Sequence, residues 1–284
     1  MDFRLNEDQQ MYVDTVRRFV KNEILPNILQ IDKSHEFPYG IIAKAWELGI
    51  LNLSVPKEVK GFEIDAVSSA LIIKELSYGD TGISTSAMCN DLANTVIAQH
   101  GSAKQKDDFL GPYAQAPLLA SFCLTEPGAG SDNSSMSTFI AKRADGKYVL
   151  NGAKCFITNA SYASQFTVFC KVGKPTAQLL ACCIVPAEEM FRDGKPNLPA
   201  KPQTELTARG GGKIVLGKPE EKLGQHLSNT ATVTFEDVVV DESQIIGDRR
   251  QGFKYLIDVL DYARPMVAAI GVGLARRALD LTLQ

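Results

Sequence analysis

The sequence predicts an α+β protein, and the spacing of apolar residues in three successive stretches carries that prediction. Apolar side chains recur at helical spacing in residues 1–117, switch to the two-residue alternation of strands in residues 118–249, and return to helical spacing in residues 250–284. Strands grouped between helical ends are typical of α+β folds rather than of alternating α/β folds. We therefore expect a helical amino-terminal domain, a central antiparallel β-barrel or sandwich, and the first helix of a carboxy-terminal helical domain.

The amino-terminal stretch contains signals for four helices. The first begins after Asn6, a residue type that caps helix amino termini, and ends before Pro26. Asp65 is a second candidate cap, and Gly79 closes the helix that follows it. The expected helices occupy residues 7–25, 38–48, 66–78 and 81–99.

The central stretch contains six strand-like runs, separated by turn residues. They lie near residues 118–124, 137–142, 147–158, 165–172, 179–185 and 231–240. Residues 187–222 interrupt this pattern with four prolines and the triplet Gly210-Gly211-Gly212. We expect an insertion that forms a mobile surface loop, and we favour flexibility over phosphate binding as the role of its glycines and lysines.

The last stretch predicts one long helix. From Phe253 to Leu279, apolar residues follow a broad helical face over about nine turns of 3.6 residues, more than one helix can bury alone. As a hypothesis, this face drives association or aggregation. Gly271 and Gly273 lie inside the helical pattern, and we expect them to allow close packing against another helix.

Composition excludes several classes of function. Apolar residues make up 45% and charged residues 22% of the 284 residues, as in ordinary globular proteins. A net charge of −3, without a basic patch interleaved with aromatics, argues against nucleic-acid binding. No apolar run approaches the roughly 18 residues of a membrane span. The six cysteines lack C-x-x-C spacing, so we expect reduced, buried thiols and no metal site.

Residues 122–132 and 148–158 carry the most informative pattern. An apolar strand breaks after Leu124 into a loop whose glycines, Gly128 and Gly130, leave its backbone N–H groups accessible. Thr125 and Ser131 add short hydroxyls to this loop. The second segment alternates as a strand, which would place Phe156 and Thr158 on one face. Together the two segments suit a flat, polar ligand.

These segments, Leu124-Thr-Glu-Pro-Gly-Ala-Gly-Ser-Asp132 and Asn151-Gly-Ala-Lys-Cys-Phe-Ile-Thr-Asn159, resemble the two flavin-contacting signatures of the acyl-CoA dehydrogenase family. The helical amino-terminal part is similar to the same family. Residues 260–279 resemble the first helix of the family's carboxy-terminal four-helix bundle, and the Ala-Arg-Pro context is short- and medium-chain-like. The resemblance implies a truncated member that lacks most of this bundle.

The resemblance implies an FAD-dependent oxidoreductase. Family members oxidise acyl-CoA thioesters to trans-2-enoyl-CoA: a carboxylate removes the α-proton, the β-hydrogen leaves as hydride to the flavin, and electrons pass to an electron-transfer flavoprotein. The expected assembly is a homo-oligomer, a tetramer or dimer. The expected location is the cytoplasm in a bacterium or the mitochondrial matrix in a eukaryote.

Site residues carried over from the family fall into two groups. Asp261, Arg264 and Ser131 are the expected substrate contacts. Glu126 and Asp132 are expected to shape the loop. The expected cofactor contacts are Phe122, Leu124, Thr125, Gly130, Ser131, Phe156, Ile157, Thr158 and Arg264.

The catalytic base is the missing part of this assignment. Most family members carry it in the later carboxy-terminal region, so the resemblance places it beyond Gln284. The alternative family position is occupied by Ala263. Two other interpretations therefore stay open: a catalytically inactive family member that at most binds flavin, and an acyl-CoA oxidase.

Overall fold

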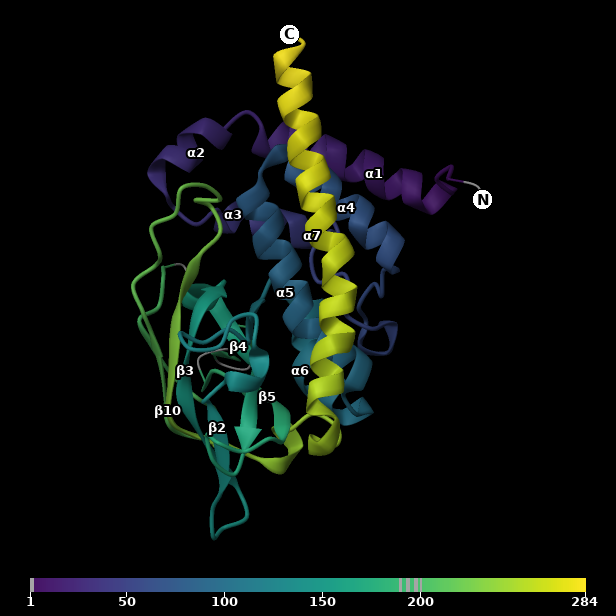
Figure 1. Cartoon of the computed structure of the whole chain (residues 1–284). Coiled ribbons are helices and arrows are strands. Elements are labelled where there is room, and N and C mark those ends of the chain that lie inside the picture. The colour runs from purple at the N-terminus through teal and green to yellow at the C-terminus, as the bar shows by residue number, and fades with distance from the viewer. Residues whose placement is uncertain (1–2, 189–190, 193–194, 197–198, 200) are drawn as a thin grey trace.

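The computed structural model describes residues 3–188, 191–192, 195–196, 199 and 201–284. Helices form one side of the molecule and a curled sheet the other, with the long helix α7 running beside both (Figure 1). The predicted α+β architecture is confirmed; the limits of the three domains stay a prediction. The α-helices are α1 (Glu7–Phe19), α2 (Ile28–Ser34), α3 (Tyr39–Glu47), α4 (Ala66–Gly79), α5 (Thr81–His100), α6 (Ala103–Gln115) and α7 (Gly252–Thr282).

The four predicted amino-terminal helices are present, and the predicted caps act at their starts. Asn6 forms a capping box with Gln9, and the Asp65 side chain accepts hydrogen bonds from the first-turn N–H groups of α4. A π-helical segment, Val20–Ile24, prolongs α1 to the predicted end before Pro26.

Sequence analysis missed α2 and α6. The seven-residue α2 is too short to show a clear helical repeat. The longer α6 begins with a capping box between Ser102 and Gln105, but Pro112 lies inside its last turn and obscures the pattern.

The main sheet has eight strands, and all six predicted strands belong to it. Its hydrogen-bonded order is β1-β4-β2-β3-β10-β9-β8, with β5 on the other side of β4. Most pairings are antiparallel as predicted, but β4 pairs in parallel with β1 and β2. The bounds of these six strands are β1 (Leu119–Cys123), β2 (Phe139–Lys142), β3 (Tyr148–Thr158), β4 (Ala163–Val172), β5 (Leu180–Pro186) and β10 (Thr230–Val240).

The prediction of a mobile loop over residues 187–222 is wrong for its second half. There β8 (Glu205–Thr207) and β9 (Lys213–Leu216) extend the main sheet from β10, and Ile214 is fully buried in the core of the sheet. Strands of three and four residues show too little alternation to be recognised. Their stability comes from backbone pairing, of β9 with β10 and of β8 with β9.

The glycine triplet lies at the turn between β8 and β9. Gly212 has a positive φ of 88°, and an added Cβ would collide with the backbone of Asp237. The triplet therefore serves backbone geometry. Two short strands, β6 (Phe191–Arg192) and β7 (Lys195–Pro196), form a separate pair, while residues 189–190, 193–194, 197–198 and 200 of the segment lie outside the described residues.

Helix α7 packs mainly against α4 and α5 (Figure 1). Its first turns bury Leu256 and Val259 in the core cluster beneath β5, and its later turns bury Met266 and Ile270 among the amino-terminal helices. Pro265 lies inside the helix, between these two sets of contacts.

The prediction of close helix packing is confirmed for Gly273 but is wrong for Gly271. A Cβ on Gly273 would collide with the backbone of α4 at Lys74, and nearby the Ser77 hydroxyl donates to the Ile270 carbonyl at 2.6 Å. A Cβ on Gly271 would meet no atom within 4 Å, because this residue faces outward.

Large apolar side chains lie on the outer face of α7. Each of Val267, Val272, Leu274 and Leu279 exposes more than half of its surface. Among the described helices, none combines the length and apolar character needed to cross a membrane.

Gly271 and Gly273 of α7 provide a matched pair of substitutions. We expect Gly273→Ala to destabilise the protein by about 1–3 kcal/mol, because α7 must move away from α4 to make room for the methyl group. Gly271→Ala should stabilise it by up to about 1 kcal/mol, since alanine favours the helix and nothing opposes its side chain. Urea unfolding of both variants measures the two effects, and equal effects would contradict the packing seen here.

Candidate functional site

The candidate site begins where β1 ends, in a loop held by a buried carboxylate. Glu126 and Ala129 exchange backbone hydrogen bonds of 3.0 and 3.1 Å, which close a tight turn around Pro127 and Gly128. The Glu126 carboxylate turns inward. There it accepts hydrogen bonds from both the backbone N–H and the hydroxyl of Ser137 and from the backbone N–H of Thr138.

The same carboxylate forms an ion pair with Lys154 of β3. The Lys154 ammonium is completely buried; it lies 2.8 Å from Glu126 and donates a 3.0 Å hydrogen bond to the Leu124 carbonyl. One lysine therefore fixes the loop at two points. Sequence analysis assigned Lys154 no role, although a lysine between strand residues of a buried sheet was a detectable signal.

This pairing keeps Glu126 charged. Burial alone would raise the pKa of its carboxyl, but Lys154 and the hydrogen bonds from Thr138 and Ser137 outweigh burial and lower the pKa to about 2. The expected loop-shaping role of Glu126 is confirmed by these contacts. Asp132 has a related role, since it accepts hydrogen bonds from Ser134 and Ser135.

The loop also rests directly on β3. The Cys155 N–H donates to the Thr125 carbonyl at 2.9 Å, and the Ser121 hydroxyl donates to the Thr158 carbonyl at 2.9 Å. The structure thus brings the two segments together, as their proposed common ligand requires.

A β-bulge in β3 changes the predicted alternation. The pairing register with β10 shifts between Lys154 and Ile157, and Phe156 has a positive φ of 57°. Lys154 and Cys155 are both buried as a result, whereas the Phe156 ring is 67% exposed. The strict two-residue alternation is therefore interrupted at the bulge. Thr158, like Phe156, lies outside the core, where it is half-buried beside Cys89.

The remaining predicted contacts differ in exposure. Gly130 and Ser131 are exposed at the loop, and Leu124 is buried below it. Phe122 is half-buried with its ring centroid 5.5 Å from that of Phe169. The Ile157 side chain is buried inside the sheet, so only its backbone could meet a ligand.

The first half of α7 packs behind this loop. Ala263 is buried in the same core cluster as Leu92 of α5, Leu124 and Ala129. Asp261 and Arg264 are exposed on the same helix and form an ion pair with each other.

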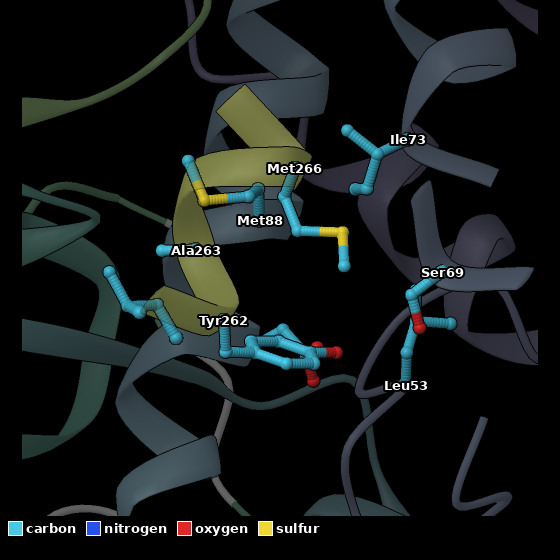
Figure 2. Close-up of a pocket in the computed structure, with 9 residues that line it drawn as sticks. Leu53, Ser69, Ile73, Met88, Tyr262, Ala263 and Met266 are labelled. Carbon is cyan, nitrogen blue, oxygen red and sulfur yellow. The ribbon is translucent and has the colours of Figure 1, made fainter. Parts of the chain in front are cut away.

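A small cavity lies beside Ala263, between α4, α5 and α7 (Figure 2). Its volume of about 10 Å³ is enough for about one water molecule. Burial raises the pKa of the Asp91 carboxyl at its edge to about 6, although bonds from Ser54 and Tyr262 partly oppose this shift. The lining residues are Leu53, Ser69, Ile73, Met88, Asp91, Leu92, Tyr262, Ala263 and Met266.

Comparison with known proteins identifies the family. Residues 6–116 match the N-terminal domain of acyl-CoA dehydrogenases, and residues 121–238 match their middle domain. The chain belongs to the acyl-CoA dehydrogenase family. This is a family of flavoprotein oxidoreductases, and the predicted membership is confirmed.

Individual family members are similar over nearly the whole chain. A probable medium-chain specific acyl-CoA dehydrogenase of Caenorhabditis briggsae is 36% identical over 99% of this chain and 64% of its own length. Butyryl-CoA dehydrogenase from Megasphaera elsdenii superimposes with a TM-score of 0.84 at 31% identity, over 99% of this chain and 69% of that one. An acyl-CoA dehydrogenase from Bacillus anthracis, solved with FAD, has a TM-score of 0.83 at 29% identity, covering 98% of this chain and 44% of that one.

The chain thus spans about two thirds or less of the length of these acyl-CoA dehydrogenases. Within the described ranges, no group of three or more His, Cys, Asp or Glu side chains is arranged to hold a metal ion. All six cysteines are free, and five of them are buried.

The buried Glu126–Lys154 pair predicts a characteristic pattern of stability in this protein. Glu126→Gln or Lys154→Met should each destabilise the protein by about 3–5 kcal/mol, because each leaves a buried charge unpaired. The double variant should lose less than the sum of the two. Urea unfolding of the four proteins measures this coupling, and strict additivity would refute it.

Acid should remove the stabilisation that the Glu126–Lys154 pair gives to the wild type. Because the folded-state pKa of Glu126 is lowered, its stabilisation is present above the ordinary value of 4.5 and is lost as the pH falls from there toward about 2. The unfolding free energy of Glu126→Gln should therefore depend less on pH across this window than that of the wild type.

Proposed function

We propose that this chain carries the flavin-binding and substrate-binding part of an FAD-dependent acyl-CoA dehydrogenase. The reaction is the α,β-dehydrogenation of an acyl-CoA thioester to trans-2-enoyl-CoA, with electrons passed to an electron-transfer flavoprotein. The observation that carries the proposal is the loop of residues 125–131, locked onto β3 by Lys154 beside an exposed aromatic ring.

The residues of this region fit a flavin ring. The Phe156 side chain projects from the bulge with most of its surface free, which suits stacking on a flat heterocycle. The Thr125 and Thr158 hydroxyls lie on the two segments that the Cys155-to-Thr125 hydrogen bond joins. No atom lies within 4 Å of where a Cβ of Gly130 would be, so the loop backbone is open to close approach. When bound, FAD would supply the acceptor for the β-hydride.

The substrate would lie between this loop and α7. Ser131 offers a hydroxyl on the loop, and Arg264 offers a cation that now pairs with Asp261. The cavity beside Ala263 is the proposed site of the acyl chain, because its lining is mostly apolar and two of its residues, Leu92 and Ala263, belong to the same core cluster as Leu124 and Ala129.

Proton abstraction needs a further group. Ala263 contributes only a methyl group to the cavity. In our proposal, a carboxylate outside residues 261–264 therefore removes the α-proton. The proposed cellular location follows the family: the cytoplasm of a bacterium or the mitochondrial matrix of a eukaryote.

Flavin binding is the direct test. After free FAD is removed, we expect the absorbance spectrum of the purified chain to show bound oxidised flavin. Phe156→Ala should weaken FAD binding by about fivefold, the scale of one aromatic stacking contact. Phe253→Ala is the matched control, because Phe253 is similarly exposed but lies at the start of α7. Equal effects of the two substitutions, or no flavin in any sample, would overturn the proposed site.

Anaerobic addition of butyryl-CoA then separates binding from chemistry. A shift of the flavin spectrum without loss of colour indicates that the chain binds substrate but lacks the base. Bleaching indicates that a base is present in the assembled protein.

We further propose that the protein forms a homo-oligomer through the exposed apolar residues of α7. Burying such side chains is favourable by about 25 cal/mol per Å². The substitutions Val267→Ser, Leu274→Ser and Leu279→Ser, combined in one variant, should lower the mass measured by light scattering after gel filtration. A wild type that is a stable monomer at all concentrations would refute the proposal.

A further inference from the structure

The lining of the cavity beside Ala263 is mostly apolar, and its polar groups lie away from Ala263. Leu92 and Ala263 on one side belong to the cluster that contains Leu124 and Ala129 of the flavin loop. On the other side lie Asp91, Tyr262 and Ser69. An acyl chain that enters from the loop would therefore meet these polar groups last.

A hydrogen-bond network holds the polar end in place. The backbone N–H and the hydroxyl of Ser54 both donate to the same Asp91 oxygen at 2.7 Å. The Tyr262 hydroxyl lies close enough to the carboxyl of Asp91 and to the side chain of Ser69 for both groups to influence its pKa. In Figure 2 the Tyr262 ring reaches from α7 across the cavity toward Ser69 and Leu53.

We propose that Tyr262, positioned by Asp91 and Ser69, closes the inner end of the acyl pocket and restricts the protein to short acyl groups. This inference rests on the proposed function and names its substrate class. Tyr262 is thus a specificity-determining residue, and Asp91 is the residue that positions it.

The cavity leaves little room for a longer chain. Its volume of about 10 Å³ holds about one water molecule, so even a butyryl chain has to push lining side chains apart, and each further methylene increases that displacement. A medium-length chain would also have to displace the Tyr262 ring, and this movement would remove its interactions with Asp91 and Ser69. Displacement would leave a buried carboxyl with one partner fewer, which is costly in an apolar surrounding.

Chain-length preference measures this restriction. Binding of butyryl-CoA and octanoyl-CoA to the flavin-loaded protein is followed by calorimetry, which does not depend on turnover. We expect the wild type to bind butyryl-CoA at least about tenfold more tightly than octanoyl-CoA. Each buried methylene normally strengthens binding by about fourfold, but the extra methylenes of octanoyl-CoA find no space in this cavity. Tyr262→Ala should raise the octanoyl-to-butyryl affinity ratio by at least about tenfold for the same reason.

Three further variants separate specificity from folding. Tyr262→Leu keeps an apolar side chain on α7, and should raise the ratio in the same direction if Tyr262→Ala does not fold. Asp91→Asn keeps the size of the side chain but weakens its hold on Tyr262, so a smaller rise is expected. Tyr78→Phe is the control, because it removes a tyrosine hydroxyl that bonds to Asp280 outside the cavity.

The outcomes distinguish the two proposals. An unchanged ratio in the folded Tyr262 variants, with butyryl-CoA bound, would overturn the length restriction and leave the proposed function intact. Equal binding of both thioesters by the wild type would do the same. If neither thioester binds to the wild type or to any variant, the proposed function fails, and the length restriction fails with it.

Discussion

The buried ion pair between Lys154 and Glu126 is the interaction on which the candidate site depends. Two charges removed from water are costly unless each is paired and hydrogen-bonded, and here three of the hydrogen bonds also fix backbone groups. Glu126 holds the N–H groups of Ser137 and Thr138, while Lys154 holds the Leu124 carbonyl. The loop between these points is therefore defined by electrostatics inside the protein, which leaves its outer face free for a ligand.

Rigidity of this kind matters for a ligand-binding loop because the loop itself contains few apolar anchors. Its exposed residues include Pro127, Gly128, Gly130 and Ser131, which bury little surface of their own. A loop of this composition would otherwise sample many conformations. The ion pair and the backbone bond between Cys155 and Thr125 restrict that freedom before any ligand arrives.

Much of the fold could be predicted from sequence because long periodic segments carry strong signals. The capped helices α1 and α4, the six longer strands and the long helix α7 all follow local spacing rules. The strands β8 and β9 could not be recognised, since they are short and depend on pairing, β9 with β10 and β8 with β9. The contrast between Gly271 and Gly273 was equally hidden, because only tertiary packing decides which of two nearby glycines faces α4.

In the candidate site too, local sequence predicted some features, while others depend on tertiary contacts. The motifs located both halves of the loop-and-strand region, and the structure brings them together. Neither the partner of Glu126 nor the bulge at Phe156 could be read locally, since both depend on which residues lie opposite in the sheet. The polar group of Ser54, Asp91 and Tyr262 joins three separate segments, so no spacing rule could have predicted it.

Pro265 gives α7 a position at which its two halves can tilt relative to each other. Proline cannot donate a hydrogen bond to the carbonyl one turn earlier, so the helix is mechanically weakest at this point. The residues before it are held by the core beneath the sheet, and those after it by the core of the amino-terminal helices. Any movement of one core relative to the other would bend α7 at Pro265. Because Tyr262 lies only three residues from Pro265, the shape of the cavity depends on the relative placement of the two cores.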